Sequence, residues 1–273
     1  MLIWLVLIPL IAAALIGLCK APARPTALLS ASLTLALGIW ALVSFDGCSS
    51  CWSRFEGMDL QLTLAPALSK VMLLLTILVT FATVLGTNPP QGGEASWYNS
   101  ALLISAGATG AFLSDNIISF FAFHELALIP TFVMIGLYGR GDRRTTAWRA
   151  TLYLGLASMV LLAALLMIGT QAGFTFSGLK DFMASGRELA HAELIGALLI
   201  AGFGTLISLF PFHSWAAPAY ASAPAPVAMM HAGVLKKFGL YGLFMFQPLM
   251  ETGFLPWTNI LLVLLVCNVI WVG

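Results

Sequence analysis

The chain has 273 residues, of which 60% are hydrophobic and only 8% are charged, and its formal net charge is +1. Because a soluble domain carries roughly 25% charged residues, this composition excludes a cytosolic globular enzyme, a nucleic-acid binder and a disordered tail. The sequence therefore predicts an all-α fold, a polytopic membrane helix bundle that is surrounded largely by lipid.

Continuously apolar stretches run along the whole chain, and each is close to the about 20 residues that a spanning helix needs. We predict nine transmembrane helices, at 2–19, 27–45, 62–86, 98–113, 117–138, 147–169, 192–212, 226–247 and 257–273. A membrane β-barrel would need short alternating segments instead. The first stretch lacks a preceding basic region, so we interpret it as a span and not as a cleaved signal peptide.

The loops between these stretches alternate in basic charge. One set is rich in basic residues: Lys20, Arg24, Arg140, Arg143, Arg144 and Arg149. In the other set Arg54, Lys180 and Arg187 are outnumbered by acids: Asp46, Glu56, Asp59, Asp181, Glu188, Glu193 and Glu251. Because an excess of Lys and Arg marks the cytoplasmic side, we predict a multi-pass protein of a bacterial-type inner (plasma) membrane with its N-terminus outside.

The chain has four cysteines, two of which lie close together in a loop. Cys19 and Cys267 lie in or near apolar stretches, where cysteine usually only packs. Cys48 and Cys51 lie on the predicted outer face, where a disulfide would persist, and a disulfide and two free thiols fit the sequence equally well. A zinc site needs more ligands than this loop offers, so we expect no metal there.

Glu125 lies near the middle of the fifth apolar stretch, directly after His124, and no residue within four positions of it is basic at pH 7. A charge at this depth costs roughly 2.5–3.5 kcal/mol on insertion scales, and such residues usually face a bundle interior or a water path. We interpret Glu125 as a proton-exchanging site. The alternative is a neutral, hydrogen-bonded carboxyl group that only holds helices together.

Lys236 and Lys237 are adjacent in the eighth stretch, so their side chains point about 100° apart on a helix. At most one of them can face a narrow polar axis squarely. Gly233, Lys237 and Tyr241 are spaced four apart and share a face. That face is small enough for another helix to approach closely.

The seventh stretch ends in a proline-rich segment that begins at Pro211 and includes His213. Proline removes a backbone donor and breaks a helix, and a broken helix at membrane depth is packed in protein or lines a cavity. Because histidine titrates near physiological pH, His213 is either a proton relay or a partner of the freed carbonyls.

Asp115 and Asn116 open the fifth stretch and predict an N-cap.

Histidines at membrane depth can also bind haem, and His124, His213 and His231 are the candidates. No apolar stretch carries a spaced pair of histidines, and the attachment motif Cys-x-x-Cys-His is absent, so we expect no haem. The sequence also lacks a nucleotide-binding loop, a zinc motif and a hydrolase triad.

Four segments resemble the antiporter-like membrane subunits of respiratory complex I, most closely those of the chain 4 (chain M) type. They are similar to parts of the family's fifth to eighth helices and comprise Ser119–Gly136, Arg144–Tyr153, Pro211–Trp215 and Ala232–Gly242. The same family includes multisubunit cation/proton antiporters and membrane-bound hydrogenases.

The resemblance implies an organisation into helix repeats. We expect three leading transmembrane helices in 1–90, a five-helix proton-channel repeat with a broken seventh helix in 97–248, and the first helix of a second repeat in 255–273. The last stretch ends at Gly273 without a polar flank. We therefore expect an incomplete or split version of the family's chain.

The resemblance also implies a function, that of a proton-translocating, non-redox subunit of NADH:quinone oxidoreductase. NADH, FMN, Fe–S clusters and quinone would then bind in partner subunits, next to neighbouring antiporter-like membrane subunits, and the isolated chain would perform no catalytic chemistry. The implied proton-relay residues are Glu125, Lys237, Lys236, His213, His231 and His124. A subunit of a cation/proton antiporter or hydrogenase complex, or a non-conducting structural subunit, is the alternative.

Two positions depart from the family's pattern. Leu206 stands where the family has a lysine, five residues before Pro211, and leucine cannot bind a proton. The segment Trp215–Tyr220 lacks the acid and the second histidine of the family. Either this half-channel is weakened, or Lys236 replaces the missing amine.

Overall fold

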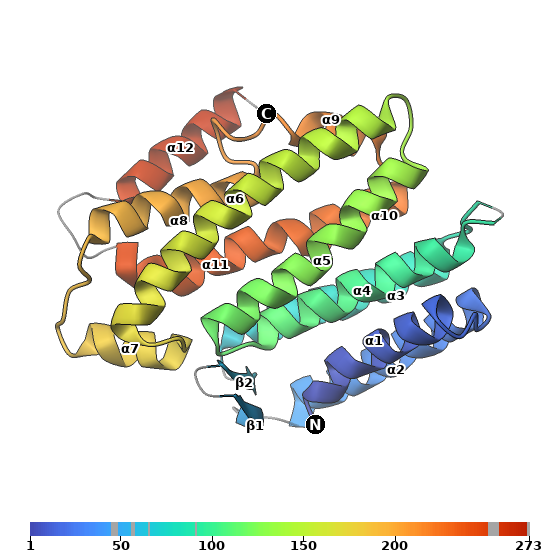
Figure 1. Cartoon of the computed structure of the whole chain (residues 1–273), viewed down its shortest axis with the longest axis horizontal. Coiled ribbons are helices and arrows are strands. Elements are labelled where there is room, and N and C mark those ends of the chain that lie inside the picture. Colours follow the sequence, from blue (N-terminus) through green and yellow to red (C-terminus); the bar gives the residue numbers. More distant parts are fainter. Residues whose placement is uncertain (45–48, 56–57, 65, 91, 251–256, 272–273) are drawn as a thin grey trace.

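A computed structural model describes residues 1–44, 49–55, 58–64, 66–90, 92–250 and 257–271 (Figure 1). The helices are α1 (Ile3–Gly17), α2 (Ala23–Ser44), α3 (Ala67–Gly86), α4 (Glu94–Leu113), α5 (Ile117–Tyr138), α6 (Arg143–Ala172), α7 (Phe176–Ala184), α8 (Ala192–Ile207), α9 (Ala216–Ser222), α10 (Ala225–Met230), the π-helix η1 (His231–Leu235), α11 (Lys236–Met250) and α12 (Trp257–Trp271). Strands β1 (Ser49–Phe55) and β2 (Met58–Thr63) form an antiparallel hairpin.

Each apolar stretch identified in the sequence overlaps a helix of the described chain, which confirms a membrane helix bundle. Among the described residues, four helices, α2, α3, α5 and α6, are long and apolar enough to cross a membrane, and α1, α8 and α12 are shorter apolar helices. The number of spans and the five-helix repeat stay predictions.

The start predicted for the third helix is wrong. Leu62 and Thr63 belong to β2, and α3 begins only at Ala67. Pro66 precedes it in an extended conformation, with φ −67° and ψ 132°. Apolar composition alone could not separate the buried strand residue Leu62 from the helix that follows.

As far as the structure describes these loops, the two sets lie at opposite ends of the bundle, as their charges predict (Figure 1). At the basic end the Tyr138 hydroxyl donates to the Gly93 carbonyl at 2.6 Å. At the other end the Asp115 N–H donates to the Gln61 carbonyl at 2.8 Å. Which end faces the cytoplasm stays a prediction.

Helix α4 occupies the centre of the bundle, where it packs against α1, α2, α3, α5 and α11. Its segment from Ser105 to Ala111 consists mainly of small residues, which let neighbouring helices approach closely. A Cβ atom on Gly107 would lie 2.6 Å from the Phe123 carbonyl oxygen and 2.9 Å from the Ala127 nitrogen. Gly107 therefore sets the position of the part of α5 that carries His124 and Glu125.

The bundle is interrupted along the segment that the prolines predict to be broken. Helix α8 ends at Ile207, and α9 starts only at Ala216. The chain then continues through α10, which follows Pro224, and η1 before α11 begins. Figure 1 shows α9 and α10 as short pieces on the side of the bundle to which the basic loop between α5 and α6 belongs.

Candidate functional site

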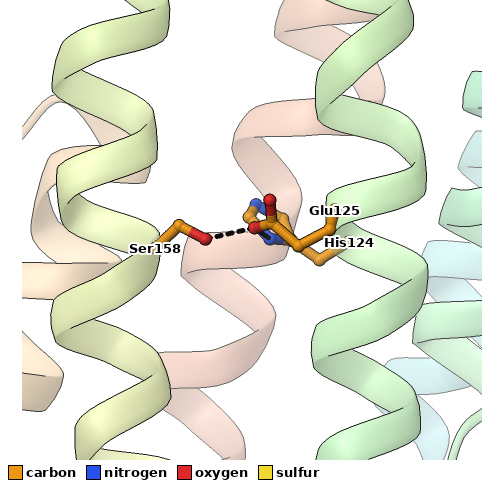
Figure 2. Close-up of polar contacts among 3 residues, drawn as sticks. All are labelled: His124, Glu125 and Ser158. Carbon is orange, nitrogen blue, oxygen red and sulfur yellow. Dashed lines mark hydrogen bonds and ion pairs between the residues drawn. The ribbon is translucent and has the colours of Figure 1, made fainter.

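Glu125 lies between α5 and α6 (Figure 2). The Ser158 hydroxyl of α6 donates a hydrogen bond to its Oε1 atom, and His124 Nδ1 lies 3.1 Å from the same oxygen. The imidazole is not aligned for a hydrogen bond, so this contact is an ion pair when His124 is protonated. The side chain of His124 is 3% exposed and that of Glu125 is 29% exposed. We call His124, Glu125 and Ser158 the carboxylate side of the site.

Local structure holds the start of α5 in place. The Asn116 side chain accepts hydrogen bonds from the backbone N–H groups of Ile118 at 2.9 Å and Ser119 at 3.1 Å. This confirms the predicted N-cap, which satisfies donors that the first turn leaves unpaired. Asp115 has a different role, because its carboxylate accepts from the Ser177 hydroxyl at 2.6 Å and so joins α5 to α7.

The partners of Glu125 are an imidazole and a hydroxyl, not the amine that the family's pattern predicts. Leu206, which occupies the position of that amine, is only 5% exposed on α8. A Cβ atom on Gly239 of α11 would lie 3.0 Å from the Leu206 Cβ, so α8 and α11 are in close contact here.

A small cavity lies between the carboxylate side and the start of η1. It has about 10 Å³ of space for the centre of a water-sized sphere, which is close to the minimum for one water molecule. Its lining is apolar apart from two histidines and the indole of Trp215, and comprises His124, Leu128, Leu154, Leu206, Trp215, His231, Leu235 and Phe238. The cavity therefore places His124 and His231 at one shared space.

The opposite wall of the cavity belongs to a second polar group. His231 is only 5% exposed, and its Nδ1 atom lies 3.0 Å from the Tyr220 hydroxyl of α9. Lys236 Nζ lies 4.9 Å from the centroid of the Tyr220 ring, a cation–π contact. We call Tyr220, His231 and Lys236 the amine side. His231 opens the π-helix η1, and π-helical turns occur frequently at functional sites.

Two predicted relay residues are not members of either side and form no side-chain hydrogen bond with them, although Lys237 directly follows Lys236 in the chain. Lys237 is half-buried and has no hydrogen bond or ion pair within the described chain. Gly233 and Tyr241, which share its predicted face, contact Val79 and Ser69 of α3, which confirms that a helix approaches this face.

His213 is the other residue that belongs to neither side. It is located in the break between α8 and α9, as predicted. Its ring stacks on Phe210 with a centroid distance of 5.7 Å, and it does not line the cavity between His124 and His231.

Sequence reasoning missed Ser158, Tyr220 and the π-helix. A signal for Ser158 existed, because it is the only polar side chain between Leu154 and Gly169. Tyr220 carried no comparable signal, since it meets His231 only across a helix break. The choice between a Cys48–Cys51 disulfide and two free thiols stays open, because Cys48 lies outside the described residues.

Residues 114–272 match a protein family described as NADH:quinone oxidoreductase/Mrp antiporter, TM. The chain is 32% identical over 211 residues to NAD(P)H-quinone oxidoreductase chain 4 2 of Microcystis aeruginosa, an alignment that covers 75% of this chain and 37% of that relative. The chain thus spans well under half the length of this curated relative.

Solved structures share the fold. One chain of respiratory complex I from Thermus thermophilus with bound NADH has a TM-score of 0.83 and 26% identity, over 97% of this chain and 56% of that one. A chain of the Mrp complex from Dietzia sp. DQ12-45-1b has a TM-score of 0.80 at 24% identity, over 96% of this chain and 29% of that one, which is a likeness of fold alone.

Proposed function

This chain belongs to the NADH:quinone oxidoreductase/Mrp antiporter membrane family, and we propose that it is a proton-translocating membrane subunit of an NADH:quinone oxidoreductase. Electron transfer from NADH through FMN and Fe–S clusters to quinone would take place in partner subunits. The curated relative named as chain 4 of NAD(P)H-quinone oxidoreductase supports this choice within the family. Neighbouring antiporter-like membrane subunits would be its direct partners.

One observation carries the proposal, namely the position of Glu125 against His124 and beside a small cavity that a second histidine lines. In surroundings of low dielectric constant, a carboxylate and an imidazolium strongly stabilise each other's charge. A charge change in a neighbouring subunit that weakens this pair would release or take up a proton at membrane depth.

The proposal extends to the organisation of the chain. Residues 97–248 would form the proton-channel repeat, 1–90 the leading helices, and 255–273 the first helix of a second repeat. The N-terminus would face the outside of the membrane, because the basic loops lie at one end of the bundle. Lys237 and His213 would serve this repeat through water or neighbouring subunits.

A second candidate is a subunit of a cation/proton antiporter, which the family's description and the fold shared with the Mrp complex favour. A third is a membrane subunit that does not conduct protons, which Leu206 favours because an apolar side chain replaces the family's lysine. The three candidates differ in whether proton transport occurs and whether it depends on electron transfer.

The experiment uses inside-out membrane vesicles from cells that make this chain in its complex. Dye quenching reports vesicle acidification per electron transferred from NADH to a quinone analogue, for wild type and Glu125→Gln. The matched control is Glu94→Gln, since Glu94 is exposed in the first turn of α4. The difference between wild type and Glu125→Gln defines the Glu125-dependent proton yield.

We expect Glu125→Gln to lower acidification per electron while the amount of assembled complex and the Glu94→Gln control stay at the wild-type level. Full acidification by an assembled Glu125→Gln complex would contradict the relay role and leave a structural subunit. Acidification driven by a sodium gradient without NADH would favour the antiporter.

A further inference from the structure

We propose that Tyr220, together with one water molecule in the cavity, connects His124 to Lys236 and so provides a proton path that passes Leu206. This inference rests on the proposed function and names the residues through which the proton moves. Its first support is the cavity itself, which has space for about one water molecule and is lined by both His124 and His231.

The free nitrogens of the two histidines supply the polar partners of that water. His124 uses Nδ1 toward Glu125, and His231 uses Nδ1 toward Tyr220, so the Nε2 atom of each ring remains for a molecule in the cavity. The Trp215 indole N–H is engaged, because it donates to the Thr205 carbonyl at 3.0 Å. The two imidazoles are therefore the hydrogen-bonding groups that the cavity lining offers to the water.

Tyr220 supplies the second part of the connection. Its hydroxyl is 3.0 Å from His231 Nδ1, and Lys236 Nζ lies 4.9 Å from the centroid of its ring. The proposed route requires the Lys236 side chain to turn along the ring so that its amine meets the hydroxyl. Tyr220 thus contacts both an imidazole and an amine, across the break that separates α9 from α10.

One proton can move from Glu125 to Lys236 along these groups without changing the number of protons on the groups between them. After the Glu125 and His124 side chains turn into hydrogen-bond alignment, the protonated Glu125 carboxyl gives its proton to Nδ1 of His124, whose Nε2–H proton passes to the water. The water gives one of its protons to Nε2 of His231, whose Nδ1–H proton passes to the Tyr220 oxygen as the Tyr220 hydroxyl proton passes to a neutral Lys236 amine. The transfer leaves a carboxylate and an ammonium, and each group between them keeps its number of protons.

Leu206 makes this route necessary. It lines the same cavity, is buried and carries no group that can bind a proton. A proton that leaves Glu125 toward the amine side must therefore pass around it. His231 lines the cavity and contacts the Tyr220 hydroxyl, whereas His213 does not line the cavity.

The test is Tyr220→Phe in the vesicle assay, because this change removes the hydroxyl and keeps the ring that Lys236 and His231 contact. The matched control is Tyr153→Phe, whose hydroxyl accepts from Ser214 at 2.9 Å in the same broken segment and contacts neither His231 nor Lys236. We expect Tyr220→Phe to lower the Glu125-dependent proton yield by about tenfold or more. The reason is that loss of a positioned acid–base group slows proton transfer by at least this factor. Tyr153→Phe should leave it unchanged.

Two further measurements distinguish proton transfer by Tyr220 from a purely structural role of this residue. Tyr220→His restores a protonatable side chain and should recover part of the yield, and all yields are divided by the amount of assembled complex. A wild-type yield per complex in Tyr220→Phe, beside a lowered yield in Glu125→Gln, would overturn the inference alone. Wild-type yields in both variants would overturn the proposed function as well.

Discussion

The carboxylate side and the amine side of the cavity are built from different kinds of backbone. His124, Glu125 and Ser158 lie on two long, regular helices, α5 and α6. The amine side comes from the short α9, the π-helix η1 and the first residue of α11. A regular helix holds adjacent side chains at fixed angles, whereas a broken segment can bring distant residues together and can rearrange.

The two sides also differ in how firmly their side chains are held. The acid is held in place by the close contact of Gly107 with α5, which leaves little freedom at positions 123–127. The amine side contains the flexible Lys236 side chain beside a π-helical turn. We therefore expect loss of the proton-binding groups of the carboxylate side, Glu125 and His124, to remove proton exchange and substitutions on the amine side to reduce its rate.

The largest effect is expected from His124→Phe, which removes the imidazole next to Glu125 while filling similar space. The Glu125-dependent proton yield should fall to near zero in the vesicle assay. His213→Phe is the comparison, since His213 stacks on Phe210 and does not line the cavity, and it should lower the yield far less. Equal losses of proton yield in the two variants would show that His124, which lines the cavity, has no greater role than His213 in the break.

A smaller effect is expected from Lys236→Leu. The contact with Tyr220 favours Lys236 as the terminal amine, although the family's pattern assigns the relay to Lys237. We expect Lys236→Leu to slow acidification by about tenfold or more, as for Tyr220→Phe, and Lys237→Leu to slow it less, measured per assembled complex. An unchanged proton yield in Lys236→Leu would mean that this lysine does not replace the amine missing at Leu206.

The smallest effect is expected from Ser158→Ala, which removes the hydroxyl that donates to Glu125. A hydrogen bond to a charged group contributes about 1.5–3 kcal/mol when it is buried, and the 29% exposure of Glu125 reduces that figure. Acidification should slow about two-fold. Thr170→Ala is the control on the same helix, because its hydroxyl donates only to α6 carbonyls, and a similar slowing there would contradict a specific role of Ser158.

Much of the fold could be predicted from local sequence. The apolar stretches contain the helices, Asn116 caps α5, and the prolines after Ile207 coincide with the break. The hairpin before α3 could not be predicted, because an apolar residue such as Leu62 fits a buried strand and a membrane helix equally well. Helix α7, which is short, was likewise missed.

The sequence alone determined that a carboxyl group and an imidazole are adjacent at membrane depth, because His124 and Glu125 are neighbours within a long apolar stretch. Only the tertiary structure decided their partners. Ser158 reaches Glu125 across 33 positions, and Tyr220 reaches His231 across 11 positions and a helix break. The reason is physical: hydrophobicity and proline act on nearby residues, whereas helix crossings depend on close contacts such as that of Gly107 with α5.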